Sequence, residues 1–260
     1  MHAEALDIPR SSDIPGQRND TPRSAYEPPV EWRVESVTSL VAGTPRDNFG
    51  TKQTDWINAV TQGASGEAGS VFVAGDQSLL KKPCIAIIGA RKATPAGAQR
   101  ARQLARQLVG EGVVIVSGLA DGIDTAALTS AMEHDGQVVA VIGTPLDQAY
   151  PAKNKRLQEE IYRHHLLISQ FRSGSRVFPS NFPARNRTMA ALSDASIVME
   201  ASDSSGTLHQ ATECVRLGRW LGIAQSVIDD PTLTWPERFT SYEKFVPLSN
   251  TKQMLRTIYG

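Results

Sequence analysis

Short apolar segments alternate with amphipathic ones from residue 71 to about residue 224, and this alternation predicts the fold. The segments expected to form strands are residues 71–73, 84–88, 113–116, 138–142, 166–168, 197–199 and 221–224. Those between residues 84 and 199 are nearly continuous apolar runs, as expected of parallel strands that are covered on both faces. The pattern therefore favours a buried parallel sheet over a half-exposed antiparallel one.

The amphipathic stretches between these segments predict helices. Thr94 and Pro95 supply an N-cap and a first-turn proline to a helix that has its apolar residues on one face. Asp124 and Asn154 are expected to cap the next two helices, and Gly218 to close a helix over residues 207–217. Because strand and helix alternate at the spacing of right-handed crossovers, we predict an α/β fold with a Rossmann-like, doubly wound, mostly parallel sheet.

The N-terminal part of the chain lacks this pattern. Residues 1–35 are rich in Pro, Ser, Asp and Arg without an apolar period, and we expect a disordered or extended tail. Residues 36–70 give weak signals, a helical turn near Trp56 followed by small residues after Gly63, and we expect a short segment and a linker. The Rossmann-like domain is thus predicted over residues 71–260.

Composition narrows the class of partner and the compartment. The chain has 27 Lys and Arg against 27 Asp and Glu, so any site for a polyanion must be a local patch. Its two cysteines fall in a predicted strand and a predicted helix, which is typical of buried thiols in a reducing compartment. No segment is apolar enough for a membrane span or a secretory signal, so we expect a cytoplasmic protein without a membrane partner.

Loops rich in Gly, Ser and Thr follow the predicted strands, at the edge where doubly wound sheets bind ligands. Each loop leads to a helix N-terminus, where free N–H groups and the helix dipole attract phosphate. Arg91 adds a cation after the first long strand, and Ser205, Gly206 and Thr207 begin the last of these helices. No G-x-G-x-x-G follows the first strand and there is no Walker A lysine, which argues against dinucleotide binding and P-loop hydrolysis.

Residues 171–187 form the strongest local concentration of positive charge. The segment contains no acidic residue and interleaves arginines with phenylalanines: Arg172, Arg176, Arg185 and Arg187 with Phe171, Phe178 and Phe182. Arginine forks match phosphate oxygens, and phenylalanine faces stack on unpaired bases. A solvated basic loop anchored to the core by its phenylalanines is the alternative, and we favour a site for nucleic acid or nucleotide.

No catalytic or metal-binding arrangement is predicted. His134, His164, His165 and His209 lack the spacing of metal ligands, and no Ser or Cys stands in a nucleophile elbow. Glu200 and Asp194 flank the last buried strand, where they can form a polar network or supply a general base. We therefore expect no catalytic residue, no metal and no cofactor.

Five segments, in order along the chain, resemble motifs of the DprA/Smf family of DNA recombination mediators. They are residues 71–91 with their closing Gly-Ala-Arg turn, 117–124 (S-G-L-A-D-G-I-D), 143–154 (G-T-P-L-D-Q-A-Y-P-A-K-N), 182–187 (F-P-A-R-N-R) and 200–207 (E-A-S-D-S-S-G-T). The resemblance implies a homodimer that binds single-stranded DNA without catalysis and helps to load the RecA recombinase in recombination or natural transformation.

The resemblance also implies a phosphate-binding pocket. Its residues by matched position are Arg91, Ser117, Gly118, Lys153, Arg185, Asn186 and Arg187. Arg172 and residues 205–207 join them from the basic segment and the last loop. The chain departs from the family at Gln170, where a glutamate is common, and shows no winged-helix module after the core. These departures leave the pathway open among transformation, plasmid, phage and defence functions.

Two alternatives use the same phosphate cradle. One is a nucleoside monophosphate phosphoribohydrolase of the same superfamily, but those enzymes carry a catalytic glutamate where this chain has His209 and Gln210. The other is a nucleotide-sensing module that holds one free nucleotide. Binding that grows with strand length and weakens with salt distinguishes a nucleic-acid groove from either alternative. DNA, RNA and free nucleotide all remain open as ligands.

Overall fold

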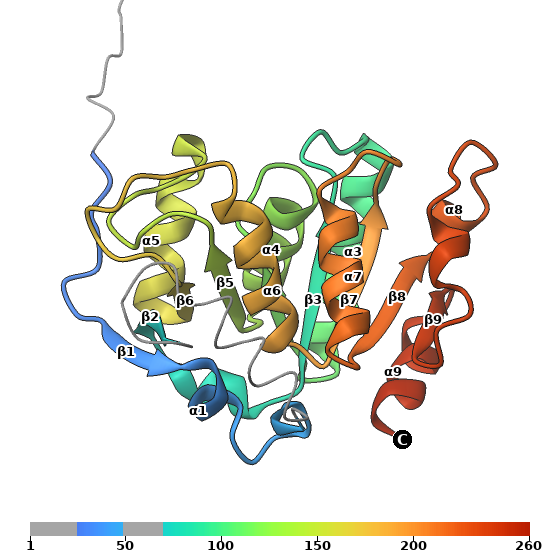
Figure 1. Cartoon of the computed structure of the whole chain (residues 1–260), viewed down its shortest axis with the longest axis horizontal. Helices are drawn as coiled ribbons and strands as arrows, with labels where there is room; N and C mark the ends of the chain where they lie inside the picture. Colours follow the sequence, from blue (N-terminus) through green and yellow to red (C-terminus); the bar gives the residue numbers. More distant parts are fainter. Residues whose placement is uncertain (1–24, 49–69) are drawn as a thin grey trace, which may run out of the picture.

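A single mixed sheet forms the centre of the protein, for which the computed structural model describes residues 25–48 and 70–260 (Figure 1). Within these ranges the strands lie in the order β1-β2-β6-β5-β4-β3-β7-β8-β9. Their bounds are β1 Arg33–Ser36, β2 Ser70–Gly75, β3 Cys84–Gly89, β4 Val114–Ser117, β5 Val138–Ile142, β6 Leu166–Ser169, β7 Ala195–Glu200, β8 Trp220–Ala224 and β9 Phe245–Leu248. The strands from β6 to β9 pair in parallel, and β2 and β1 add two antiparallel strands at one edge.

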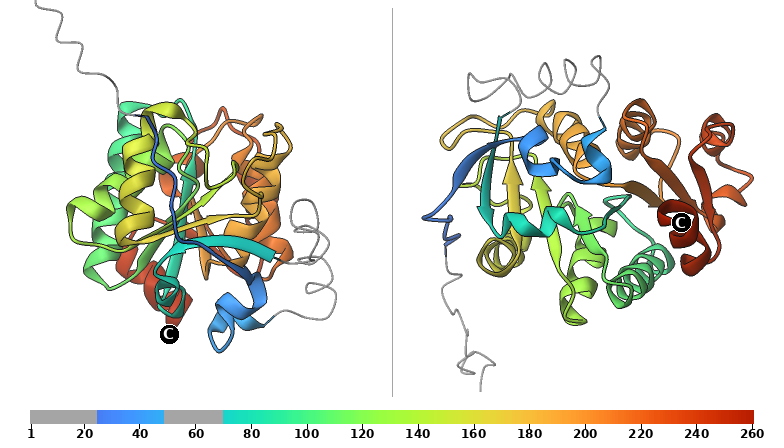
Figure 2. Two further views of the ribbon diagram at one scale, coloured as in Figure 1. Left: turned by 90° about the vertical axis from the view of Figure 1, so that its left-hand side faces the viewer. Right: turned by 90° about the horizontal axis from the view of Figure 1, so that it is seen from below.

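Helices cover both faces of this sheet (Figure 2). The helices are α1 Val37–Val41, α3 Pro95–Gly110, α4 Ile123–Glu133, α5 Lys155–His164, α6 Asn181–Ala191, α7 Thr207–Arg216, α8 Gln225–Ile228 and α9 Thr251–Tyr259. Helices α3, α4 and α5 pack on one face, and α6 and α7 pack together on the other. The predicted doubly wound α/β class is confirmed, because the central strands are buried on both sides.

The order of the strands changes direction at β3. From β3 the chain moves through β4, β5 and β6 toward one edge, and then returns to β7 on the other side of β3. The loops that leave β3 and β7 therefore diverge, and they open a crevice at the carboxyl ends of these two strands. This crevice is where the candidate site lies.

The helix caps are partly as predicted. The Thr94 side chain accepts a hydrogen bond from the backbone N–H of Gly97, and Gly218 closes α7 with a φ of +65°. The prediction that Asp124 is an N-cap is wrong, because Gly122 takes that place with a φ of +74° and Asp124 lies in the first turn of α4. Asn154 stands at the N-cap of α5, but its side chain donates to the carbonyl of Leu119 and to the hydroxyl of Thr125 in α4.

The N-terminal segment is more ordered than its composition predicts. Residues 25–35, which the sequence assigns to a disordered tail, lie along the edge of the domain, and β1 pairs with β2. Tyr26 donates a hydrogen bond to the carbonyl of Leu146, and Arg46 is buried with its guanidinium on the carbonyls of Leu80, Lys82 and Leu192. Residues 1–24 and the helical turn expected near Trp56 lie outside the described residues.

The C-terminal segment completes the opposite edge. Strand β9 extends the parallel sheet, and helix α9 packs against it. Tyr259 at the end of α9 donates a hydrogen bond to Asp194 at 3.0 Å, next to the start of β7. None of the described helices is sufficiently long and apolar for a membrane span.

Candidate nucleic-acid interface

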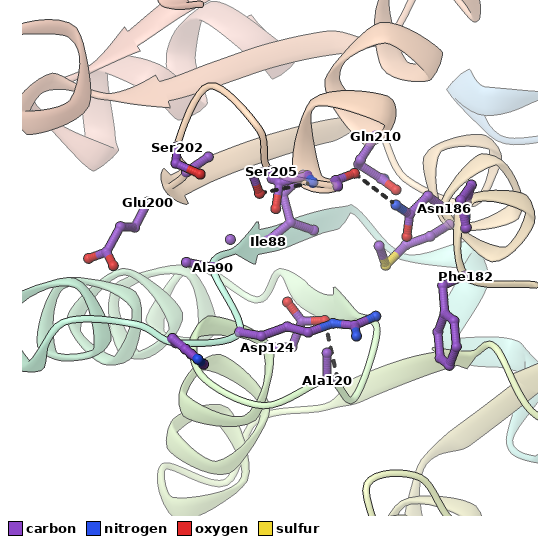
Figure 3. Close-up of a pocket in the computed structure, with 18 of the residues that line it drawn as sticks. Ile88, Ala90, Ala120, Asp124, Phe182, Asn186, Glu200, Ser202, Ser205 and Gln210 are labelled. Carbon is purple, nitrogen blue, oxygen red and sulfur yellow. Dashed lines mark hydrogen bonds between the residues drawn. The ribbon is translucent and has the colours of Figure 1, made fainter. Parts of the chain in front are cut away.

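A hollow of about 1180 Å³ opens at the carboxyl ends of β3 and β7 (Figure 3). Its walls come from the loop after β3, the start of α6, the N-terminus of α7 and the segment from α8 to Leu233. In the close-up, Phe182 and Glu200 lie at opposite ends of the hollow. Its volume exceeds the roughly 300–1,000 Å³ of common small-molecule pockets. The space therefore suits a ligand larger than one small molecule.

An arginine and two aromatic rings form one end of the hollow. The guanidinium carbon of Arg91 lies 5.0 Å from the centroid of the Phe182 ring, and the Tyr150 ring lies 5.5 Å from the same centroid. Phe182 packs directly over Gly143, where a Cβ atom would come within 2.7 Å of the ring. Arg91 is exposed and Tyr150 is 50% exposed, so a cation and an aromatic face are both open to solvent.

Arg185 forms the floor beneath this end. Only 5% of the residue is exposed, and Nη1 donates to the carbonyl of Val141 at 2.8 Å. Gly118 makes room for the side chain, since a Cβ there would lie 1.5 Å from Nη1. Burial lowers the pKa of Arg185, and the nearby carboxylate of Asp124 opposes that shift. The result is a fixed cation under the hollow.

Asp124 is the internal counter-charge of this floor. Its carboxylate accepts hydrogen bonds from the backbone N–H groups of Gly118 at 3.2 Å and Ala120 at 3.4 Å. Burial raises the pKa of Asp124, while the charge of Arg185 and these N–H donors act against the rise. Ser117 is fully buried and donates to the carbonyl of Ile87 at 2.7 Å. The polar groups of Ser117 and Gly118 thus have partners inside the protein.

The remaining basic residues of the predicted site lie outside the hollow. Lys153 pairs with Asp121 at 2.9 Å, and Nε of Arg187 lies 3.1 Å from Glu213 on α7. Arg172 is exposed and does not line the hollow. Asn186 does line it, and its Nδ2 lies 3.5 Å from the carbonyl of Gly206. The structure therefore gathers Arg91, Arg185 and Asn186 at one place and separates them from Lys153, Arg172 and Arg187.

The three phenylalanines of the basic segment have three different environments. Phe171 is 9% exposed and belongs to the core, as the sequence leads us to expect of at least one of them. Phe182 forms the aromatic end of the hollow, and the half-exposed Phe178 stands at the rim under the guanidinium of Arg176. Only the last two can meet a ligand.

The helix N-terminus after β3 is already occupied by a carboxylate of the protein. Glu200 at the end of β7 accepts hydrogen bonds from the backbone N–H of Thr94 at 2.9 Å and from its hydroxyl at 2.6 Å. A Cβ at Gly97 would lie 1.9 Å from Oε2 of Glu200, so this glycine admits the carboxylate. In dinucleotide-binding folds a phosphate occupies this position. Glu200 belongs to a polar network here.

The helix N-terminus after β7 is more open. Residues 205–207 line the hollow, and the N-cap Gly206 offers no side chain to the backbone of α7. Ser205 accepts a hydrogen bond from the backbone N–H of Thr207 at 3.2 Å. No carboxylate of the described residues binds this helix start. An anion in the hollow would find the positive end of α7 available.

The wall that α8 and the following loop contribute is not predicted from the sequence. Ser226, Val227, Asp230 and Leu233 line the hollow, and so do Lys92 and Arg100 on the α3 side. Asp203 ties this loop to the α7 side by accepting from the N–H of Thr234 at 3.1 Å and from that of Trp235 at 2.9 Å. The rule that loops after parallel strands share one edge could have pointed to this loop, since it follows β8.

Residues 53–241 match the protein family described as DNA recombination-mediator protein A. The chain belongs to this family. The match covers the strands that build the hollow, and it confirms the resemblance seen in the five motifs. Gln170, where the resemblance implies a glutamate, is buried and accepts a hydrogen bond from Thr188 at 2.7 Å.

Individual relatives agree with this assignment. The DNA processing protein DprA of Streptococcus pneumoniae is 42% identical over 160 residues, which are 61% of this chain and 56% of the relative. Protein Smf of Synechocystis is 44% identical over 129 residues, which are 50% of this chain and 32% of the relative. The chain thus spans about half, or less, of the length of these two relatives.

Two solved structures have the same fold. The X-ray structure of DprA from Streptococcus pneumoniae superposes with a TM-score of 0.66 at 35% identity, covering 76% of this chain and 69% of that one. DNA processing protein A from Helicobacter pylori, solved for its single-stranded DNA binding mode, superposes with a TM-score of 0.67 at 24% identity. That likeness covers 88% of this chain and 95% of the other.

Proposed function

We propose that the hollow holds single-stranded DNA by its phosphates and bases, and that the chain mediates DNA processing and recombination without catalysis. The observation that carries the proposal is the exposed Arg91, stacked on Phe182 above the buried cation of Arg185. Strand-binding proteins combine cations that follow the backbone with aromatic faces on which bases stack. Both elements meet at one end of this hollow.

Phosphate binding is also supported by the start of α7, where Gly206 lies beside Asn186. Residues 205–207 line the same hollow as Arg91, so the positive end of the α7 dipole lies at this hollow. Contacts of this kind carry little information about base sequence, so we expect binding without strong sequence preference. A free dinucleotide is less well supported, because Glu200 occupies the helix start that a dinucleotide would use.

The relatives support the same proposal. One structural neighbour is described by its single-stranded DNA binding mode, and another as a DNA processing protein. From the resemblance of the five motifs we further propose a homodimer, a RecA recombinase as partner, a cytoplasmic location and a role in natural transformation. Each of these four is a proposal about the whole protein.

The test is fluorescence anisotropy with labelled oligothymidylates of increasing length at two salt concentrations. AMP and duplex DNA serve as competitors. We expect the affinity to rise with length, to fall with salt and to resist both competitors. Complete competition by AMP, or equal affinity for all lengths, would overturn the strand proposal in favour of a nucleotide pocket.

The Arg91→Ala variant tests whether the strand binds at the hollow. We expect its Kd for the oligonucleotide to rise about tenfold, since a phosphate contact and a stacked guanidinium are lost together. Arg156→Ala is the matched control, because Arg156 is exposed on α5 and does not line the hollow. Equal effects of the two substitutions would mean that only overall charge matters, and that the strand binds elsewhere.

A further inference from the structure

A second hollow, of about 760 Å³, runs along the flank of α3. Gln103, Arg106 and Gln107 on α3 form one wall, and Asn250, Thr251 and Lys252 at the start of α9 form the other. The two helices lie side by side in the view from below (Figure 2), and they are joined by a hydrogen bond of 2.6 Å between Thr251 and Gln107. The hollow thus follows the outer edge of the domain.

The two hollows adjoin each other. Arg100 on α3 and Ser226 on α8 line both of them, so these residues stand at the junction. Nε of Arg100 is buried and has no hydrogen-bond partner among the described residues. A strand that extends past Arg100 from the first hollow would therefore reach the second.

The surface that runs from Arg91 in the first hollow to Lys252 in the second carries positive charge without carboxylate partners. Within the described ranges, Arg91, Lys92, Arg100, Arg106 and Lys252 form no ion pair with a carboxylate. On another flank of the same helix, by contrast, Arg102 pairs with Glu133. Glu111 is the one acidic residue among the described residues that line the second hollow. In the second hollow Arg100, Arg106 and Lys252 therefore outnumber the single carboxylate, and this local positive charge complements a polyanion.

The chemistry of the second hollow differs from that of the first. Its described lining includes amide, hydroxyl and cationic side chains but no aromatic ring, so it offers contacts to phosphates and no platform for stacking. From Arg100 to Gly110, α3 extends about 15 Å. That length accommodates a few successive phosphates of an extended single strand.

We propose that the second hollow receives the continuation of the same single strand, held there by its phosphates alone. The inference rests on the proposed function, since it extends the strand that the first hollow is proposed to bind. It divides the binding surface into a segment that stacks bases at Phe182 and a segment that guides the backbone along α3. Arg106 and Lys252 are the residues that define the second segment.

The test compares short and long oligothymidylates on the Arg106→Ala/Lys252→Ala double variant. We expect unchanged affinity for the shortest oligonucleotide that binds, and a loss of about five- to tenfold for strands several nucleotides longer. For the long strand, the slope of the logarithm of the binding constant against the logarithm of the salt concentration should become shallower by about 1.4. The reason is that two phosphate contacts are lost, each of which contributes about 0.7. Arg156→Ala/Arg256→Ala is the control, since both residues are exposed and outside the two hollows.

The outcomes separate this inference from the proposed function. If the wild-type protein binds no oligonucleotide, the proposed function fails and this inference fails with it. If the wild-type protein binds with length dependence but the double variant matches it at every length, only the second segment is refuted. A loss of affinity that is equal for short and long strands would also refute it, because the contacts of Arg106 and Lys252 would then belong to the first segment.

Discussion

The strand order reverses at β3, and the helices on the two sides of this point differ in whether a carboxylate of the protein lies at their N-terminal ends. On the β3 side, the start of α3 is filled by the carboxylate of Glu200, and the turn before α4 is filled by that of Asp124. On the β7 side, the start of α7 is formed by Gly206 and is open to the hollow. All three helix starts lie at one edge of one sheet. Only the third is left for an anion from outside.

This difference shows why the fold does not by itself decide the ligand. A doubly wound sheet supplies several positive helix ends at its carboxyl edge, and each can hold a phosphate. In this chain two internal carboxylates remove two of those ends from use. Arg91 and the start of α7 remain, and both line one large hollow. Such an arrangement suits a chain of phosphates better than one compact pyrophosphate.

The largest effect is expected from removing an internal carboxylate whose counter-charge is buried. Asp124→Ala leaves the guanidinium of Arg185 buried without its compensating charge, and frees the N–H groups of Gly118 and Ala120. We expect the free energy of unfolding to fall by about 3 kcal/mol. Urea denaturation measures the change.

The same turn offers a matched control for this prediction. Asp121 also carries a carboxylate, but it pairs with the exposed Lys153 at the surface. Asp121→Ala should therefore cost under about 1 kcal/mol. A similar loss for both variants would contradict the assignment of Asp124 as the buried counter-charge of the floor.

A smaller effect, on the affinity for the strand, is expected from placing a carboxylate at the N-terminus of α7. Gly206 has a φ of −61°, and nothing lies within 4 Å of a Cβ built there, so Gly206→Asp fits without strain. The new carboxylate would cap α7 as Glu200 caps α3, and would stabilise the fold by a few tenths of a kcal/mol. We expect the Kd for oligothymidylate, measured by anisotropy, to rise about tenfold.

Gly206→Asn separates charge from capping. Asparagine caps a helix about as well as aspartate but brings no negative charge. It should therefore stabilise α7 and leave most of the affinity intact. If the two substitutions weaken binding equally, the space at Gly206 matters and its charge does not. If neither changes the affinity, the start of α7 lies outside the strand's path.

The central fold could be predicted because its signals are local. Strands buried on both faces are runs of apolar residues, and the start of α3 is marked by Thr94 and Pro95. Strand β1 gives no such signal. It is an edge strand in which Arg33 and Glu35 alternate with Val34, and its order comes from pairing with β2. Composition alone therefore assigned it to the tail.

The candidate site could be predicted only in part, because burial of a charged side chain is a tertiary property. Arg185 and Arg187 stand two residues apart in one motif and have the same signal in the sequence. The turn of α6 places the first over Gly118 and directs the second to Glu213. Asp124 likewise has the sequence signal of an N-cap. The positive φ of Gly122 starts α4 one residue after that glycine, which puts Asp124 inside the first turn.

The smallest effect is expected from neutralising the carboxylate at α3. In Glu200→Gln the amide oxygen can still accept from the N–H of Thr94, so the helix start keeps most of its support. The hollow loses one negative charge at the end opposite Phe182. We expect oligothymidylate to bind about two- to threefold more tightly at low salt, and the gain to disappear at high salt because it is electrostatic.

Glu243→Gln, an exposed position outside the hollow, should show no such gain. Weaker binding in Glu200→Gln would mean that the carboxylate contacts the strand itself, and the contrast between a filled and an open helix start would then no longer explain where the phosphates bind.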